Sequence, residues 1–337
     1  MEILNPDLYS GNIIRTRVRL ARNLRDYPFR VEDPAVAREI VKKVNRALVK
    51  ADTFNLYFVS KLDDITLEAM KERHLISNNL IENRDCGAAL INSDESLSIM
   101  VNEEDVIREQ CFMKGLRLFE AYKRLDGVDD ELSKNLDFAF DKDFGYLTAC
   151  PTNLGTGMRA SVMLFLPALT ESGRIKQVVR EVAESGLTVR GLYGEGSKAE
   201  GFMYQISNEI TLGISEYDII KTVEETVLAV CKLERETEER LFVKRELQTM
   251  DRAKKAFGVL TNAVLLPYKE FLALIAEVKL GVILGMINVS DVSALDDLIV
   301  SVRPANLCVQ FGRPLSDTDR DLLRAEMVGK KLTKLTE

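Results

Sequence analysis

Arginine recurs at every second position near the amino terminus, at Arg15, Arg17 and Arg19. Side chains of a β-strand alternate between its two faces, so this period of two predicts a strand with three guanidinium groups on one face. Like charges this close repel one another unless an anion lies between them. An exposed strand edge protected by charge is the structural alternative. We interpret the segment as a strand that contributes to an anion-binding site.

Strands and helices are mixed through the first two thirds of the chain. The pair Asp33-Pro34 is typical of a helix amino terminus, and apolar residues follow it at helical spacing. Apolar runs bounded by turn formers predict strands over 55–60, 88–92, 97–101, 188–191 and 203–206. A further apolar run over 159–166 leads through Pro167 into a helix predicted to end near residue 185.

From about residue 216 the pattern changes to long helices. The highly charged stretch 232–245 is the expected domain boundary, which gives a first domain over 1–232 and a helical domain over 233–337. The same stretch is interpreted as a solvated helix face. Ser316 and Asp319 have the spacing of a capping box, which predicts the start of a final helix.

Composition limits the class of protein. With 46% hydrophobic and 29% charged residues, the 337-residue chain is expected to fold as a soluble globular protein. No apolar run is long enough for a membrane helix, and the amino terminus does not read as an export signal. The five cysteines include no CxxC pair, which argues against a disulfide framework or a zinc site and favours the reducing cytoplasm. The net charge of −7 does not indicate nucleic-acid binding, although arginine-rich segments permit local anion sites.

The chain has a single histidine, His74. Most Ser-His-Asp, Cys-His and histidine-metal schemes need an imidazole beside a specific partner. Catalysis is therefore expected to use carboxylates, arginines or cysteine. From the sequence alone, a histidine at a helix end or on the surface is the default interpretation of His74.

Two acidic clusters, 102–105 and 194–196, occur where predicted strands end, and several arginines occur near loops and strand ends. Arginine forks can bind a polyphosphate, and carboxylates can hold a cationic group. The pattern therefore suits a reaction that joins an anionic substrate to a cationic one. The chain has no GxxxxGK[ST] segment, so phosphate binding is expected to work without a P-loop.

Four segments, in order, resemble the signatures of the ATP:guanido phosphotransferases, the family that includes arginine and creatine kinases. They are Thr16-Arg17-Val18-Arg19, Asn102-Glu103-Glu104-Asp105, Cys150-Pro151-Thr152-Asn153-Leu154-Gly155-Thr156 and Arg190-Gly191-Leu192-Tyr193-Gly194-Glu195. The resemblance covers about residues 11 to 230. It implies an α+β fold, in which a large antiparallel sheet flanked by helices forms the catalytic domain and an α-helical domain follows.

The resemblance also implies the cofactors and the site residues. ATP and Mg²⁺ are expected, with magnesium held mainly by the phosphates and no metal site on the protein itself. Nucleotide contacts are expected from Arg15, Thr16, Arg17, Val18, Arg19, His74, Arg108, Arg159, Ala160, Ser161, Val162, Met163, Arg190, Gly191, Leu192, Tyr193 and Gly194. The guanidinium substrate is expected between Glu104 and Glu195, with Cys150 beside it. A buried structural thiol is the alternative for Cys150.

The chemistry gives these residue types a purpose. A guanidinium has a pKa above about 12, so a carboxylate must orient it and accept its proton as the N–P bond forms. Glu104 and Glu195 are the candidates for this pair. Glu103 and Asp105 are expected to support Glu104 or to cap a following helix. The glycines over 191–201 predict a mobile loop, and the resemblance implies that this loop closes over the substrate.

Within the family the chain is most similar to the bacterial protein-arginine kinases, because the arginine strand begins almost at once and the chain ends in a characteristic motif. The resemblance implies protein substrates, a Clp protease or chaperone and an activator protein as partners, a cytoplasmic location, and a homodimer formed by the helical domain. The motif residues Arg320, Asp321, Arg324 and Ala325 would sense phosphoarginine as an allosteric ligand. Ordinary ion pairs on a helix surface are the alternative for this spacing.

Two positions depart from the family pattern. Val106 stands where most members have histidine, and Arg15 stands where serine is common. Neither change affects the expected catalytic pair, but both affect the details of the nucleotide site. Two rival functions stay open. One is a kinase for free arginine or another small guanidino compound, and the other is a phosphoarginine-binding adaptor with little activity.

Overall fold

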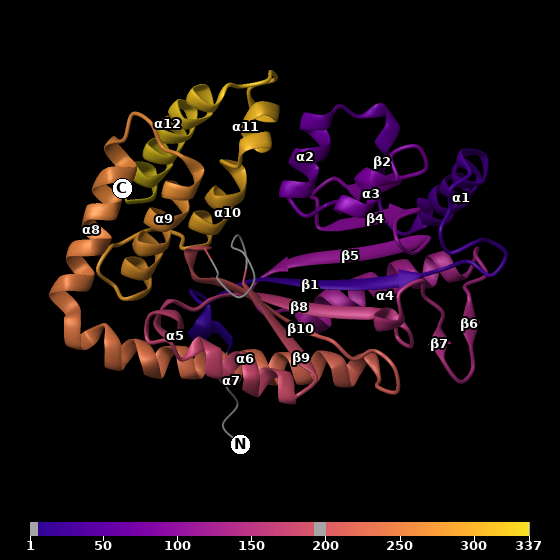
Figure 1. Cartoon of the computed structure of the whole chain (residues 1–337), viewed down its shortest axis with the longest axis horizontal. Helices are drawn as coiled ribbons and strands as arrows, with labels where there is room; N and C mark the ends of the chain where they lie inside the picture. The colour runs from indigo at the N-terminus through magenta and orange to yellow at the C-terminus, as the bar shows by residue number, and fades with distance from the viewer. Residues whose placement is uncertain (1–5, 192–199, 337) are drawn as a thin grey trace.

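The computed structural model describes residues 6–191 and 200–336, and its centre is one eight-stranded antiparallel sheet (Figure 1). The strand order is β2-β3-β4-β5-β1-β8-β10-β9, so the arginine strand β1 lies in the middle. The strands of this sheet are β1 (Ile13–Arg22), β2 (Phe54–Phe58), β3 (Ala88–Asn92), β4 (Leu97–Val101), β5 (Ile107–Lys114), β8 (Met158–Phe165), β9 (Leu187–Gly191) and β10 (Met203–Asn208). A separate small hairpin consists of β6 (Phe140–Asp141) and β7 (Gly145–Tyr146).

Helices flank the sheet and form a second unit beside it (Figure 1). Those that accompany the sheet are α1 (Pro34–Ala47), α2 (Asp64–Glu72), α3 (Asn78–Glu82), α4 (Leu118–Ser133), α5 (Pro167–Glu171), α6 (Ile175–Glu184) and α7 (Glu216–Leu241). The second unit, called the helical unit below, consists of α8 (Glu246–Asn262), α9 (Tyr268–Ile283), α10 (Ser293–Ser301), α11 (Pro304–Gln310) and α12 (Asp317–Thr336). The expected α+β fold with a large antiparallel sheet and a helical carboxy-terminal region is confirmed.

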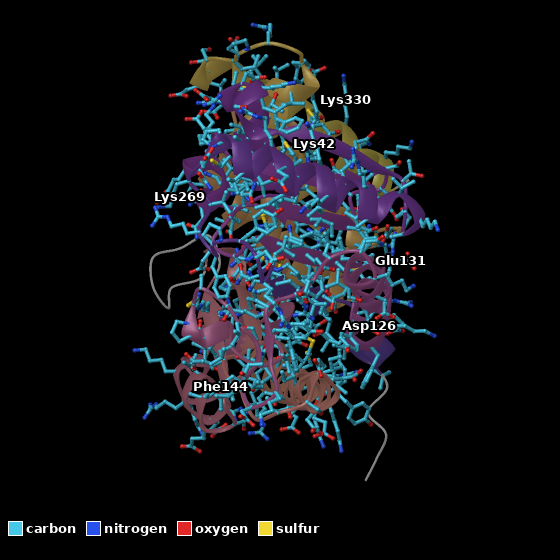
Figure 2. The ribbon with its side chains drawn as sticks, turned by 90° about the vertical axis from the view of Figure 1, so that its right-hand side faces the viewer. Lys42, Asp126, Glu131, Phe144, Lys269 and Lys330 are labelled. Carbon is cyan, nitrogen blue, oxygen red and sulfur yellow. The ribbon has the colours of Figure 1, made fainter. Side chains whose placement is uncertain are left out.

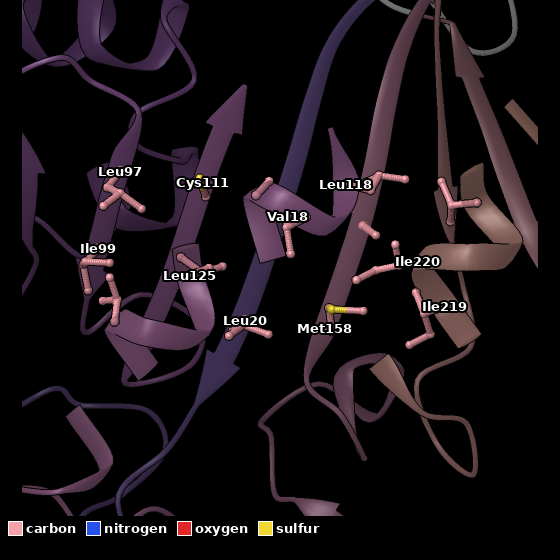
Figure 3. Close-up of a cluster of buried hydrophobic side chains, with 14 of the residues drawn as sticks. Val18, Leu20, Leu97, Ile99, Cys111, Leu118, Leu125, Met158, Ile219 and Ile220 are labelled. Atoms are coloured by element: carbon pink, nitrogen blue, oxygen red, sulfur yellow. The ribbon is translucent and has the colours of Figure 1, made fainter. Parts of the chain in front are cut away.

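The two faces of the sheet differ in chemistry. On one face Val18 and Leu20 of β1 are buried against α4 and α7, in a core that also includes Ile99 and Cys111 (Figure 3). The opposite face carries the odd-numbered arginines of β1 and is covered by α2 and α3 only over its β2–β5 half. The period-two pattern therefore places the arginines on the face away from the main core, as the sequence predicts.

Local sequence signals explain several element boundaries. Asp33 accepts a hydrogen bond from the Ala35 amide at 2.7 Å and begins α1, with Pro34 in the first turn. Ser316 accepts one from the Asp319 amide at 3.1 Å, so the capping box that begins α12 is confirmed. The single helix predicted to end near residue 185 is wrong, because Gly173 adopts a left-handed φ of 73° and separates α5 from α6.

The charged stretch 232–245 is not a solvated face throughout, and this expectation needs correction. Helix α7 runs through residue 232 without a break and ends at Leu241. Glu234 is fully buried, where it accepts hydrogen bonds from the amides of Ala168 and Leu169 at 2.6 and 2.9 Å. Glu238 is also buried and accepts one from Asn12. These carboxylates anchor α7 to the sheet and to the first turn of α5.

The helical unit has its own core, which includes Leu260, Phe271, Leu295 and Leu332. This core continues onto the sheet through Met203 of β10. Within the described residues, no helix is long and apolar enough to span a membrane. Charged side chains such as Lys42 and Lys330 project from the outer surface (Figure 2).

We expect stability to depend on pH through Glu234. Burial raises the pKa of this carboxyl from an ordinary 4.5 to about 8. The pKa of Glu234 is higher in the folded state than in the unfolded state. Its contribution to the free energy of unfolding is therefore fully present below about pH 4.5 and is lost as the pH rises through about 8. Glu234→Gln removes this titration. Between about pH 5 and 8, the unfolding free energy of the wild type should therefore fall relative to the variant, by up to about 1.4 kcal/mol per pH unit. Urea denaturation across this range measures it, and parallel profiles would contradict it.

Candidate active site

The site is built on the arginine face of the sheet, around its central strand β1. In the sheet register, Arg19 is the cross-strand partner of Arg159 on β8 and of Gln110 on β5. Arg17 is the cross-strand partner of Ser161 on β8. Arg108 lies two residues before Gln110, so it belongs to the same face. Four guanidinium groups from three adjacent strands therefore gather on one surface.

Burial, together with this concentration of positive charge, lowers the pKa of Arg17 and of Arg19. Burial, followed by the charges of Arg15, Arg108 and Arg159, lowers the pKa of Arg17 to about 10. The pKa of Arg19 is lowered in the same direction, first by burial and then by neighbouring arginines. The Nε of Arg19 is buried and has no hydrogen-bond partner among the residues that the structure describes. A bound polyanion would neutralise these charges and supply the missing acceptor.

A cavity of about 200 Å³ lies above these arginines. Its walls include Arg17, Arg19 and Arg108 from the sheet, and His74 from the turn after α2. The cavity has the size and the donors that a few phosphate groups require. Arg159 lies beside it on β8, where burial and the nearby charge of Arg190 lower its pKa.

His74 is both a helix-end residue and a site residue. It follows the end of α2 with a left-handed φ of 64°, and its carbonyl accepts a hydrogen bond from Gln110 at 3.0 Å. Burial and then the charges of Arg17 and Arg15 lower the pKa of the imidazole to about 3. The ring is therefore neutral at physiological pH, and within the described part of the chain its buried Nε2 has no hydrogen-bond partner. A neutral imidazole here can accept or donate one hydrogen bond to a ligand.

The four clustered arginines, Arg17, Arg19, Arg108 and Arg159, are called the phosphate clamp below. The acidic turn between β4 and β5 connects a carboxylate to this clamp. Arg108 forms an ion pair with the buried Glu103 at 2.6 Å and a longer one with Glu104 at 3.3 Å. The Glu104 side chain is 35% exposed. Partial burial raises its pKa, an effect that the charge of Arg108 opposes. Glu104 is thus held by an arginine of the clamp while one side of it faces solvent.

Asp105 joins the Glu104 turn to the cysteine loop. It is fully buried and accepts hydrogen bonds from Asn23 at 2.8 Å and from the amide of Ala149 at 2.7 Å. Asp105 follows Glu104 in the chain and Ala149 precedes Cys150. Their hydrogen bond therefore links the turn of Glu104 to the loop of Cys150. Glu103 and Asp105 both support Glu104, as expected. The alternative that they cap a helix is wrong, since β5 follows the turn.

The cysteine loop is held in a fixed shape. Cys150 is partly exposed, so the alternative of a buried structural thiol is wrong, and its Sγ lies 3.0 Å from the hydroxyl oxygen of Thr152. Thr211 donates hydrogen bonds to the carbonyls of Thr152 and Leu154. Gly155 adopts a φ of 107°, and a Cβ there would overlap the Thr211 carbonyl. Only glycine allows this close approach, which explains the glycine of the motif.

The structure divides the expected nucleotide residues into two groups. Ser161 and Met163 point to the arginine face, and Gly191 ends β9. Four others have buried side chains on the opposite face, away from the arginines: Thr16, Val18, Ala160 and Val162. Leu192, Tyr193, Gly194 and Glu195, together with most of the expected mobile loop, lie outside the described residues.

Both departures from the family pattern have a structural setting. Val106 is fully buried in the core, and its amide donates to Asn23 at 2.8 Å. The guanidinium of Arg15 lies 4.4 Å from the centre of the Phe112 ring, within the range of a cation–π contact. Arg15 also lowers the pKa of Arg17, so it adds to the positive potential of the site.

The carboxy-terminal motif lies far along the chain in α12. Arg324 is 1% exposed and donates hydrogen bonds to the carbonyls of Val302 and Leu266 and to Asp321, at 2.7 to 2.9 Å. Its guanidinium therefore holds α12 to two neighbouring segments, which is not an ordinary surface ion pair. Ala325 is also buried. Arg320 is partly exposed and pairs with Asp317.

Two further residues belong to the site, although no motif in the sequence indicates them. Gln110 and Ser207 face the arginine cluster, and Ser207 accepts hydrogen bonds from Arg159 at 3.0 and 3.3 Å. Gln110 follows Arg108 at the strand period, which is a signal that could have identified it. Ser207 gives no comparable signal, because its neighbour Arg159 lies on a different strand.

Comparison with known protein families identifies the chain. A model described as "ATP:guanido phosphotransferase, C-terminal catalytic domain" matches residues 35–237, which is more than half of the chain. The chain belongs to the ATP:guanido phosphotransferase family. It is therefore an ATP-dependent phosphotransferase. A second model, "Protein-arginine kinase McsB C-terminal domain", matches residues 246–337 and so covers the helical unit of this guanido phosphotransferase.

Curated relatives of this guanido phosphotransferase match over nearly their whole length. A protein-arginine kinase of Caldanaerobacter subterraneus subsp. tengcongensis is 42% identical, and the match covers 96% of this chain and 97% of the relative. A protein-arginine kinase of Clostridium acetobutylicum is also 42% identical, with 98% of each chain covered.

Solved structures of guanidino kinases share the sheet. The duplicated taurocyamine kinase from Schistosoma mansoni with bound transition state analog components gives a TM-score of 0.62 at 28% identity, and the match covers 71% of this chain and 35% of that one. A lombricine kinase gives a TM-score of 0.59 at 25% identity, with 68% of each chain covered.

We expect the Arg19 side chain to lower the free energy of unfolding and the Arg22 side chain to raise it, although both residues lie on β1. Arg19 faces other cations, whereas Arg22 faces the opposite side and forms a buried ion pair with Asp129 at 2.8 Å. Arg19→Met should raise the free energy of unfolding by about 1 kcal/mol and abolish ADP binding. The matched Arg22→Met should lower it by about 3 to 5 kcal/mol. Denaturant unfolding with ADP calorimetry tests both, and a destabilised Arg19→Met protein that still binds ADP would contradict the assignment.

Proposed function

We propose that this phosphotransferase is a protein-arginine kinase, which transfers the γ-phosphoryl group of ATP to arginine side chains of proteins. One observation carries the proposal: Arg108 belongs to the phosphate clamp and also pairs with Glu104. The anion site and the carboxylate that would hold a guanidinium are thus only one side chain apart. This is the arrangement that a reaction between a polyphosphate and a guanidinium needs.

Glu104 is proposed as the residue that orients the substrate guanidinium and accepts its proton. A free guanidinium has a pKa above about 12, so the proton must leave as the N–P bond forms. Partial burial raises the pKa of Glu104, which makes it a stronger base than an exposed glutamate. Glu195 is proposed as the second carboxylate. It lies outside the described residues, so its role rests on the sequence motif.

The arginines would stabilise the transition state. Phosphoryl transfer needs little covalent chemistry from the protein, so positioning and charge stabilisation supply most of the rate. Arg17, Arg19, Arg108 and Arg159 already repel one another and would gain the most from the developing negative charge. Cys150, beside the Glu104 turn, is proposed to contact the guanidinium without acting as a nucleophile.

Magnesium is proposed to reach the site with ATP. In the described part of the chain, no group of three histidine, cysteine, aspartate or glutamate side chains lies close enough to hold a metal. The cavity donors are arginines, which fit phosphate oxygens and not a cation. The ion would counter charge on the transferring phosphoryl group.

Two sets of relatives bear on the acceptor. Proteins named protein-arginine kinase match nearly the whole chain, and a model named for such a kinase matches the helical unit. These matches support protein arginine as the acceptor. The second candidate is a kinase for a small guanidino compound, which the likeness to taurocyamine and lombricine kinases favours. The complete arginine clamp and Glu104 argue against the third candidate, an adaptor with little activity.

The wider role is part of the same proposal. Phosphorylated proteins would be delivered to a Clp protease, in a cytoplasmic stress response that also involves an activator. The helical unit would form a homodimer. Arg320 and Asp321 are partly exposed and would contribute most directly to phosphoarginine sensing. Arg324 and Ala325 would support that site from the interior.

We expect Glu104→Gln to lower kcat by about 10² to 10⁴, because the amide cannot accept the proton. The affinity for ADP should stay within about twofold, since Glu103 still pairs with Arg108. Glu120→Gln is the matched control, because Glu120 is exposed on α4 and forms only a 3.9 Å ion pair with Arg117. Full activity of Glu104→Gln in a steady-state assay would refute the role of Glu104.

The acceptor can be tested directly with the wild-type enzyme. We expect acid-labile phosphate to appear on the arginines of an unfolded protein incubated with magnesium-ATP. Free arginine at the same guanidinium concentration should react at least about tenfold more slowly, because it lacks contacts outside the reacting group. Lysine-substituted substrate protein is the control. Faster reaction of free arginine would favour the small-molecule candidate.

A further inference from the structure

The hairpin of β6 and β7 projects from the sheet on the side opposite the helical unit (Figure 1). Two of its phenylalanines are largely exposed, Phe140 at 52% and Phe144 at 54%. Figure 2 views the molecule from this side and labels Phe144. Phe138, at the base of the same hairpin, is buried in the main core. The fold therefore uses one aromatic side chain of the hairpin for packing and leaves two largely in solvent.

The hairpin presents these two rings from a fixed backbone. Phe140 and Tyr146 are cross-strand partners, and their rings meet edge to face with centres 5.3 Å apart. Asp141 accepts hydrogen bonds from two amides of the turn at 2.8 and 3.1 Å. On the inner side, the buried guanidinium of Arg22 lies 3.5 Å from the centre of the Tyr146 ring. The hairpin is thus anchored to the core while its outer rings stay exposed.

The hairpin is also joined to the cysteine loop of the candidate active site. Tyr146 and Gly155 exchange two backbone hydrogen bonds, at 2.8 and 3.3 Å, on either side of the cysteine motif. Phe144 precedes Cys150 by six residues, so their Cα atoms lie no more than about 22 Å apart. The exposed aromatic surface is therefore continuous with the loop that carries Cys150.

The charge around the exposed rings is negative. Residues 136–147 contain three aspartates and one lysine, which gives this segment a net charge of −2. Asp143 in the turn is exposed, and Asp141 is partly exposed. At the base, Asp137 pairs with Arg25 at 3.2 Å. A segment that carries positive charge is the complementary partner for such a surface.

The size of the exposed surface also limits its partner. A phenylalanine buries roughly 150 to 250 Å², so two half-exposed rings offer about 200 Å² together. A stable dimer interface buries about 800 Å² on each partner. The two rings are therefore too small for a dimer interface, and they suit one or two apolar side chains of an extended segment.

We propose that this hairpin binds the protein substrate beside its target arginine, with Phe140 and Phe144 in contact with an apolar side chain of the substrate. The inference rests on the proposed function, since a protein is taken as the acceptor. An extended chain advances about 3.3 Å per residue, so a side chain about two to six residues from the target arginine reaches the hairpin. Unfolded proteins expose such apolar side chains. The hairpin would thus favour arginines within unfolded segments.

Two peptides test this preference with the full-length enzyme. Each carries one arginine, and the positions three residues before and after it are leucine in one peptide and serine in the other. The wild type should have a KM at least about fivefold lower for the leucine peptide, with kcat values within about twofold, because the added contact is the same in the ground and transition states.

Phe144→Ser should raise the KM for the leucine peptide at least about fivefold and leave the KM for the serine peptide within about twofold. Turnover of the serine peptide also shows that the variant is folded and that its cysteine loop is intact. Phe144→Leu should restore the preference, because leucine keeps an apolar contact. Phe311→Ser is the matched control, since Phe311 is 43% exposed in the helical unit and should keep the wild-type preference.

Equal KM values for the two peptides in the wild type would overturn the proposal and leave the proposed function standing. A Phe144→Ser variant with unchanged KM values would also overturn it, and if its oligomeric state changed, the hairpin would be a contact between copies instead. An equal loss for both peptides would show that the ring acts only through the cysteine loop. If the wild type phosphorylated free arginine but neither peptide, the proposed function itself would fail.

Discussion

The mutual repulsion of arginines in the middle of the sheet is the constraint on which the site depends. Arg17 and Arg19 lie on the central strand, where strands on both sides fix their backbone, so they cannot separate. Burial and the neighbouring positive charges both lower the pKa of these arginines, because their charged forms are held away from water and close together. A bound polyphosphate would neutralise these charges and so remove the repulsion. Part of the affinity for ATP is thus set when the sheet forms.

Three loops depend on this strand and its neighbour β5 for their positions. Arg108 bonds to the acidic turn, Asp105 bonds that turn to the cysteine loop, and Gln110 bonds to the turn of His74. Glu103 and Asp105 are buried and hydrogen-bonded, so the turn that carries Glu104 has little freedom. Preorganisation of this kind lets electrostatic stabilisation act without reorganisation during the reaction. The helical unit also contacts the turn of His74, because the amide of Ala305 donates a hydrogen bond to Glu72 at the end of α2.

Much of the sheet and the site could be predicted from the sequence, because strand period and turn residues are local signals. The arginine alternation correctly placed three guanidinium groups on one face. Features that depend on distant partners could not be predicted. The sequence predicts Glu234 to be part of a charged surface, whereas in the fold it accepts hydrogen bonds from amides of α5. The spacing of Arg324 likewise suits a surface ion pair, whereas in the fold it donates to the carbonyls of Val302 and Leu266.

A crystal structure with a non-hydrolysable ATP analogue would show whether the arginine cluster holds the phosphates. Phosphate oxygens should lie within hydrogen-bond distance, about 2.7 to 3.2 Å, of the guanidinium groups of Arg17, Arg19 and Arg108. The buried Nε of Arg19 would then have an acceptor. A triphosphate bound elsewhere, with these guanidinium groups still facing only one another, would contradict this expectation.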